Sequence, residues 1–195
     1  MKGWPIVFVA LALFCIGQMG VGAQEPRMAE PAWSVGDMWT YANEVSGKRE
    51  IVTIMVVAVR DKDYTIRTIQ ADGHYELSSA PRENTPVGNL GGVGEISWPL
   101  SVGQHWSGYD SSTHLKIEAT VDAFELVVVP AGTIGAFRIA LRACADAPQG
   151  ACGSVRLWVA PQVKSLVKLE FGREPAIPEK ARGATLTLVA YAVAP

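Results

Sequence analysis

Histidine is the side chain in this sequence with the widest chemical range, because imidazole titrates near neutral pH and binds metals. The three histidines are His74, His105 and His114. On a strand, His114 and Glu118 would share one face, and His105 could approach them across a hairpin. One hypothesis is therefore a metal-dependent hydrolase that uses His105, His114 and Glu118. Their spacings match no zinc motif. The sequence therefore favours histidines on solvated polar faces, with no metal and no cofactor.

Nucleophilic catalysis has equally little support. The sequence contains no Gly-x-Ser-x-Gly elbow, and Ser111-Ser112 falls in a predicted turn. Asp61 and Asp63 also fall in a turn, where water solvates carboxylates. The glycines of the Pro- and Gly-rich segment 80–97 follow neither a dinucleotide fingerprint nor a phosphate-loop pattern. These patterns predict a protein that is not an enzyme and has no catalytic residues.

The first residues have the pattern of a secretory signal peptide. Lys2 precedes an apolar run over residues 6–16, and the small residues Val21-Gly22-Ala23 form a cleavage site. Cys15 lacks the small residues that precede a lipidated cysteine. We therefore expect cleavage after Ala23, a flexible segment over 24–30 and one domain over 31–195. That mature chain would be periplasmic or extracellular and would have no transmembrane segment.

Charge and composition exclude nucleic acid as a partner. The chain has 17 Lys and Arg against 19 Asp and Glu, and its longest run of adjacent cations is the pair Lys48-Arg49. A protein that binds nucleic acid usually shows a basic stripe that neutralises phosphates. With 49% hydrophobic residues, the chain is instead typical of a globular domain that buries a core.

Two cysteines remain after cleavage, Cys144 and Cys152, and seven residues separate them. The flanking residues on both sides read as strands, and Pro148 and Gly150 provide a turn between them. This arrangement predicts a structural disulfide that closes a hairpin loop, in agreement with export. A redox or metal pair is the alternative, although the spacing differs from a thioredoxin-type motif.

Strand periodicity runs through most of the chain. Apolar residues alternate with polar ones from 115 to 121 and continue with the opposite parity from 124 to 128, which predicts a bulge at Asp122-Ala123. One short helical turn is predicted over 178–182, ended by Gly183. The fold class is therefore all-β, a curved antiparallel sheet or half-barrel built from a meander of hairpins. The other predicted strands are 51–59, 137–142, 155–159, 167–171 and 186–193.

An internal repeat is the most informative feature. Ser34-Val35-Gly36-Asp37-Met38-Trp39 returns as Ser101-Val102-Gly103-Gln104-His105-Trp106. Val-Gly can form a tight turn that leads into a strand, with the indole over the end of the core. The functional alternative is that Trp39, Trp106 and Trp158 bind a ligand. The sequence favours packing, because large aromatics in small β-proteins are usually buried.

Several of these motifs resemble those of a known protein family. The repeated Val-Gly-x-x-Trp, Pro130-Ala131-Gly132-Thr133 and the Trp-x-x-Pro element that begins at Trp158 resemble a family of exported bacterial all-β proteins of unknown function. The resemblance covers residues 33–191 and implies an open, strongly curved sheet, similar to periplasmic lipoprotein carriers. It implies no catalytic residues. Lys164 departs from the pattern, because glycine is common at that position.

These observations favour a non-catalytic exported protein that binds an apolar or amphipathic ligand, a lipophilic small molecule, or an envelope protein. Residues 80–97 would act in this hypothesis as a movable cover of the curved sheet, and a linker or a plain surface loop is the alternative for that segment. A structural or interaction scaffold of the cell envelope is the alternative within the non-catalytic class.

Overall fold

The computed structural model describes residues 25–82, 96–110, 115–145, 151–175 and 177–195. These residues form strands, turns and one short 3₁₀ helix. The predicted signal peptide and the centre of the segment 80–97 lie outside them. The elements are β1 (Arg27–Met28), β2 (Met38–Val45), β3 (Lys48–Val59), β4 (Asp63–Gln70), β5 (Tyr75–Pro81), β6 (Leu100–Ser101), β7 (His105–Asp110), β8 (Leu115–Val129), β9 (Gly132–Ala145), β10 (Cys152–Ala160), β11 (Ser165–Phe171), η1 (Glu179–Ala181) and β12 (Thr185–Ala192).

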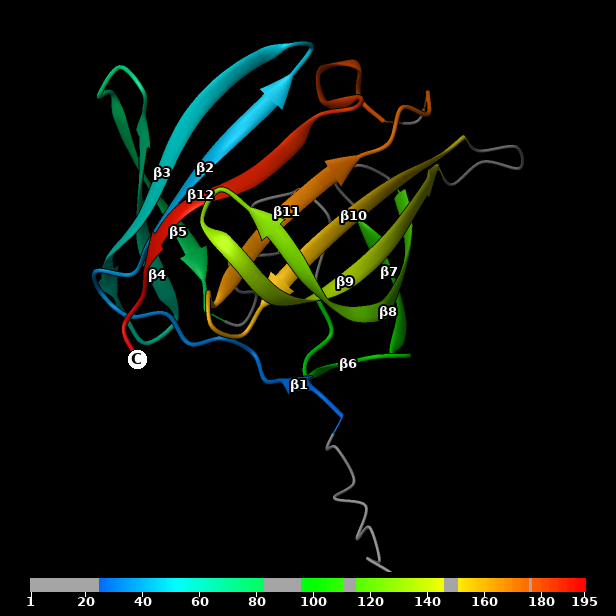
Figure 1. Ribbon diagram of the computed structural model, residues 1–195, viewed down its shortest axis with the longest axis horizontal. Helices are drawn as coiled ribbons and strands as arrows, with labels where there is room; N and C mark the ends of the chain where they lie inside the picture. The colour runs from blue at the N-terminus through cyan, green and yellow to red at the C-terminus, as the bar shows by residue number, and fades with distance from the viewer. Residues whose placement is uncertain (1–24, 83–95, 111–114, 146–150, 176) are drawn as a thin grey trace, which may run out of the picture.

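Ten of the strands form one antiparallel sheet that is strongly curved and not closed (Figure 1). Its order is β5-β4-β3-β2-β12-β11-β10-β9-β8-β7. The sheet therefore consists of two meanders, one from β2 to β5 and one from β7 to β12, joined where β12 pairs with β2. The predicted all-β half-barrel of hairpins is confirmed. No helix among the described residues is long and apolar enough to span a membrane.

Local chemistry explains the turns. Ser46 and Gly47 both have positive φ, 51° and 78°, and they connect β2 directly to β3, which is the geometry of a two-residue hairpin. The predicted bulge is present, because the β8–β9 register shifts between Val121 and Ala123. The predicted helical turn is also present as η1, and Gly183 follows it with a φ of 66°.

The inner, concave face of the sheet carries the core. Trp39, Tyr41, Leu157, Ile139 and Val121 are fully buried, and the strand register places all of them on this face. The core continues at the N-terminal side, where β1 pairs with β6 and Met28 is buried. Arg27 and Met28, which fall in the segment that the sequence predicted to be flexible, are thus paired in a strand.

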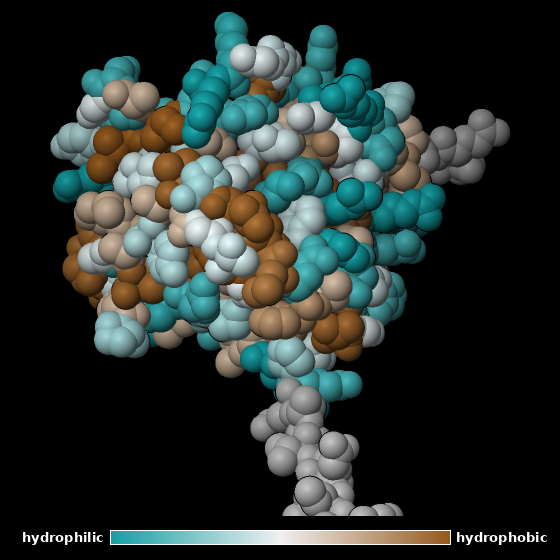
Figure 2. Space-filling model, in the orientation of Figure 1, coloured by the Kyte–Doolittle hydropathy of each residue, from teal (hydrophilic) through white to brown (hydrophobic). Residues whose placement is uncertain are grey.

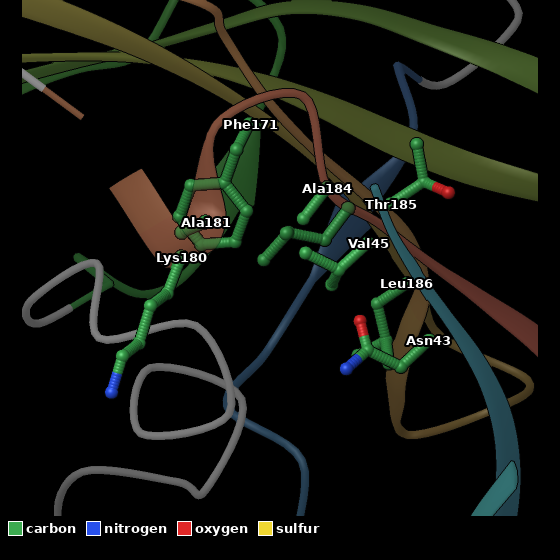
Figure 3. Close-up of a pocket in the computed structure, with 9 residues that line it drawn as sticks. Asn43, Val45, Phe171, Lys180, Ala181, Ala184, Thr185 and Leu186 are labelled. Carbon is green, nitrogen blue, oxygen red and sulfur yellow. The ribbon is translucent and has the colours of Figure 1, made fainter. Parts of the chain in front are cut away.

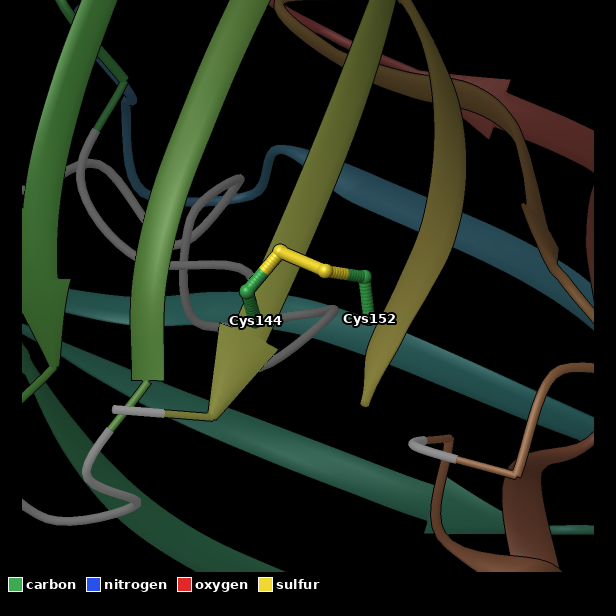
Figure 4. Close-up of a disulfide and its surroundings, with 2 residues drawn as sticks. All are labelled: Cys144 and Cys152. Atoms are coloured by element: carbon green, nitrogen blue, oxygen red, sulfur yellow. A yellow bond between two sulfur atoms is a disulfide. The ribbon is translucent and has the colours of Figure 1, made fainter. Parts of the chain in front are cut away.

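The β8–β9 hairpin is long and curls across the outer face of the sheet, over β11 and β12 (Figure 1). Its turn is tied down there, because Ala131 N–H donates to Leu188 O at 3.3 Å. At the opposite end of β9, the predicted disulfide joins Cys144 to Cys152, which are register partners on β9 and β10 (Figure 4).

Candidate functional site

Trp33 and Trp39 hold the turn between β10 and β11. Trp39 Nε1–H donates to Val163 O and Trp33 Nε1–H donates to Lys164 O, both at 2.8 Å. The two indoles are in contact, with ring centroids 4.3 Å apart. The first Val-Gly-x-x-Trp element therefore contacts the turn that follows the Trp-x-x-Pro element, and Trp33, for which the sequence predicted no role, completes the contact.

The sequence repeat is a repeat of structure. In the first copy, Ser34 N–H donates to Asp37 Oδ2 at 2.9 Å, and Gly36 N–H donates to Val56 O on the next strand. The second copy has the same two hydrogen bonds, from Ser101 N–H to Gln104 Oε1 and from Gly103 N–H to Val121 O. Gly36 and Gly103 have φ values of 95° and 86°. Glycine is needed at both positions because other residues rarely adopt this conformation.

The three tryptophans for which the sequence raised a ligand-binding role do not form one platform. Trp39 and Trp106 lie on the inner face, where Trp39 is fully buried and Trp106 is partly buried against the core. Trp158 lies on the outer face as the register partner of Arg138 and Lys168. Its indole N–H donates to Glu125 Oε1 at 2.7 Å. A ligand-binding role for these residues stays a prediction.

Around Trp158 the outer face carries a network of charged side chains. Arg138 donates to Asp122 Oδ1 at 2.8 Å and to Glu125 Oε2 at 3.0 Å. These carboxylates raise the pKa of the Arg138 guanidinium, chiefly through the hydrogen bond to Asp122. Lys168 Nζ lies 5.1 Å from the centroid of the Trp158 ring. The charges neutralise one another, so this network accounts for its residues without a ligand.

The two histidines among the described residues are both exposed. His74 is exposed in the β4–β5 turn, and His114 lies outside the described residues. His105 and Glu118 share the outer face of β7 and β8, where His105 Nδ1 lies 3.4 Å from Thr120 Oγ1. Within the part of the chain that the structure describes, no three His, Cys, Asp or Glu side chains are grouped so that they could hold a metal ion.

A pocket of about 220 Å³ opens at one end of the inner face (Figure 3). Leu186 of β12 lies between its register partners Asn43 of β2 and Leu169 of β11, and η1 borders the pocket. We call this site the β12 pocket. It is lined by Asn43, Val45, Leu169, Phe171, Lys180, Ala181, Ala184, Thr185 and Leu186.

The lining of the β12 pocket is mostly apolar, with polar groups at its edge. Phe171, Val45 and Leu186 gather at its centre, whereas the ammonium group of Lys180 extends away from them (Figure 3). A second depression, lined in part by Lys48 and Arg49, adjoins it, because Thr185 borders both. Apolar walls with a few polar groups are typical of sites for small apolar or amphipathic molecules.

The sequence predicted no site at the β12 pocket, although Leu169, Phe171 and Leu186 fall in predicted strands. The residues of the pocket come from both ends of the chain, and only the pairing of β12 with β2 brings them together. One signal was present in the sequence: residues 186–193 are apolar at both parities, which is typical of a strand that has neighbours on both faces.

A second exposed apolar feature lies on β8. Phe124, Leu126 and Val128 are 40%, 74% and 81% exposed and have the same parity on the strand. We call them the β8 ridge. Figure 2 shows apolar surface on the face where the β8–β9 hairpin lies. Phe124 contacts Phe137 edge to face, with ring centroids 4.9 Å apart, so only part of the ridge is packed.

No family model matches the sequence, and no curated protein does. Among solved structures, a protein of Bacteroides fragilis, described as exported and as having a YmcC-like fold, matches with a TM-score of 0.50 at 13% identity, over 85% of this chain and 99% of that one. A protein of Parabacteroides distasonis described as a lipoprotein matches with a TM-score of 0.47 at 12% identity, over 85% and 99%. The MucA/MucB complex of Pseudomonas aeruginosa matches with a TM-score of 0.42 at 16% identity, over 82% of this chain and 52% of that one. The first likeness shows a shared YmcC-like fold.

Proposed function

We propose that this chain is an exported, non-catalytic protein that binds an apolar or amphipathic ligand in the β12 pocket. The observation that carries the proposal is the pocket itself, a mostly apolar opening at one end of the inner face of the curved sheet, the face that also carries the buried core. Removing apolar surface from water would supply the binding free energy, at about 25 cal/mol for each Å².

Export is supported by the signal-peptide pattern of residues 1–23 and by the disulfide, which forms and persists in oxidising compartments. The Bacteroides fragilis protein with the same fold is described as exported, which agrees with this location. We place the mature chain in the periplasm or the extracellular space.

The binding experiment compares two substitutions that add the same ring. Ala181 borders the β12 pocket, so Ala181→Phe fills it, whereas Ala190→Phe places a ring on exposed β12 surface. We expect the wild type and Ala190→Phe to take up the neutral lipophilic dye N-phenyl-1-naphthylamine saturably, and Ala181→Phe to bind it at least tenfold more weakly. Ala181→Leu, a smaller change, replaces Ala181→Phe if circular dichroism shows that the latter is unfolded. Equal uptake by all variants, or no uptake by the wild type, would contradict the proposal.

A scaffold that binds an envelope protein is the second candidate function, and the exposure of Leu126 and Val128 favours it. It is tested separately from the pocket. A photo-crosslinking amino acid at Leu126 would capture one specific envelope protein, and Ala181→Phe would leave that capture unchanged. Failure to capture a specific protein would remove this candidate and leave the pocket proposal standing.

A further inference from the structure

The one charged residue among those lining the β12 pocket is Lys180. It lies on η1, is exposed, and forms no ion pair with any residue that the structure describes. A lysine places its methylene stem along apolar surface while its ammonium group stays in water. Lys180 therefore has the position of a group that meets the polar end of a molecule whose apolar part is inside the pocket.

A second lysine, Lys48, lies at the start of β3, beside the end of β2 that lines the pocket. Lys48 is the register partner of Val45, which lines the pocket, so both side chains leave the sheet on the same face. Lys48 is also exposed and lines the adjoining depression. By register Arg49 and Glu44 leave the sheet on the opposite face, 3.9 Å apart, and both also line this depression. On the same strand, the acidic residue Glu50 shares the face of Lys48; it is the partner of Asn43 and does not line the pocket.

We propose that the ligand of the β12 pocket is a single-chain amphiphile with an anionic head, a carboxylate or a phosphate. Its apolar chain lies against Phe171 and Leu186, and Lys180 and Lys48 hold its head at the rim. The proposal rests on the proposed function and adds the charge of the ligand. The volume of about 220 Å³ is below the roughly 300–1,000 Å³ of sites that enclose drug-sized ligands, which agrees with one chain whose head stays outside.

The test is isothermal titration of the full mature protein with four probes of equal chain length: decanoate, decyl phosphate, neutral 1-decanol and decyltrimethylammonium. We expect at least one of the two anions to bind about three- to tenfold more tightly than decanol, and the cation more weakly than decanol. Comparing decanoate with decyl phosphate distinguishes a fatty-acid head from a phosphate head. The preference for the anion falls in 0.5 M salt, because exposed charges are screened.

The variants separate charge from pocket shape. Lys48→Gln with Lys180→Gln brings anion and decanol affinity to within about twofold of each other. Glu50→Gln, the control of opposite sign, strengthens anion binding slightly. A wild type that binds decanol and both anions equally, or an anion preference that survives the double substitution, would overturn this inference and leave the proposed function intact. Binding of none of the probes would overturn both. Binding only to phosphatidylglycerol vesicles, and to no monomeric probe, would show a membrane-surface site instead and would also overturn the inference.

Discussion

Lys164 occupies a backbone conformation that favours glycine, with a φ of 56°. It closes the β10–β11 turn, and its carbonyl accepts the indole N–H of Trp33. The sequence marked this position through the resemblance, in which glycine is common there. The structure shows that the turn keeps the left-handed conformation although the residue is lysine, so the side chain is accommodated at a cost in free energy.

Lys164→Gly is therefore expected to raise the free energy of unfolding by about 0.5–1 kcal/mol. The left-handed conformation costs a non-glycine residue about 1–2 kcal/mol, and the greater freedom of glycine in the unfolded chain offsets about half of that gain. Urea unfolding measures the change. The control is Lys164→Ala, which removes the side chain but keeps Cβ and should give no gain. Equal gains from both substitutions would show that the side chain, rather than φ, is responsible.

Tyr41 is fully buried on β2, with its hydroxyl 3.1 Å from both Ser165 Oγ and Leu166 O. Burial raises the pKa of this hydroxyl above its usual value of about 10, and the hydrogen bond with Ser165 offsets part of the rise. Below pH 10 the folded and unfolded states are both protonated, so stability is unaffected. Above it the unfolded state loses the proton more readily, and stability falls as pH rises.

We expect this single group to cost about 1.4 kcal/mol of unfolding free energy between pH 8 and pH 11. The measurement is urea unfolding at both pH values for the wild type and Tyr41→Phe. Tyr41→Phe should be less stable at pH 8 but should lose less stability than the wild type on going to pH 11. The same pH dependence in Tyr41→Phe and the wild type would contradict the assignment.

At the scale of elements, much was readable from the sequence. Alternation of apolar residues predicted β8, β9, β10 and β11, and the change of parity at Asp122-Ala123 predicted the bulge, because a single extra residue reverses the faces of a strand. The Val-Gly-x-x-Trp repeat predicted two turns. The sequence did not predict β1, because a two-residue strand has no periodicity to detect. It also did not predict the contact of Trp33, which joins residues far apart in the chain.

The two copies of the repeat differ at one instructive position. Asp37 in the first copy is buried and accepts hydrogen bonds from Ser34 N–H and from Ala194 N–H at the end of the chain, the latter at 2.7 Å. Gln104, its counterpart, accepts only from Ser101 N–H among the described residues and is partly exposed. The first turn therefore also fixes the C-terminal end of β12.

This difference predicts unequal effects of the same substitution. Asp37→Ala leaves two amide groups without their acceptor and should lower the free energy of unfolding by about 2–4 kcal/mol, whereas Gln104→Ala should cost about 1 kcal/mol or less. Hydrogen exchange should in addition show faster exchange at Ala194 in Asp37→Ala alone. Similar losses in the two variants would mean that the tie between Asp37 and the chain end contributes little.

At the scale of the whole molecule, the sequence predicted a curved antiparallel sheet but not its strand order. Hairpins follow from local turns, whereas the pairing of β12 with β2 joins strands from opposite ends of the chain and leaves no local pattern. The β12 pocket depends on that one pairing. For this reason its residues could not be identified from the sequence, although the apolar character of residues 186–193 indicated a strand inside the sheet.

Native mass spectrometry of the protein purified gently from its own cell envelope tests the central claim most directly. We expect the polypeptide to begin at Gln24 and the wild type to carry a small-molecule adduct that dissociates on collisional activation. Folded Ala181→Phe should lack the adduct, and Ala190→Phe should retain it. An adduct-free mass for the wild type, or the same adduct on Ala181→Phe, would contradict a ligand in the β12 pocket.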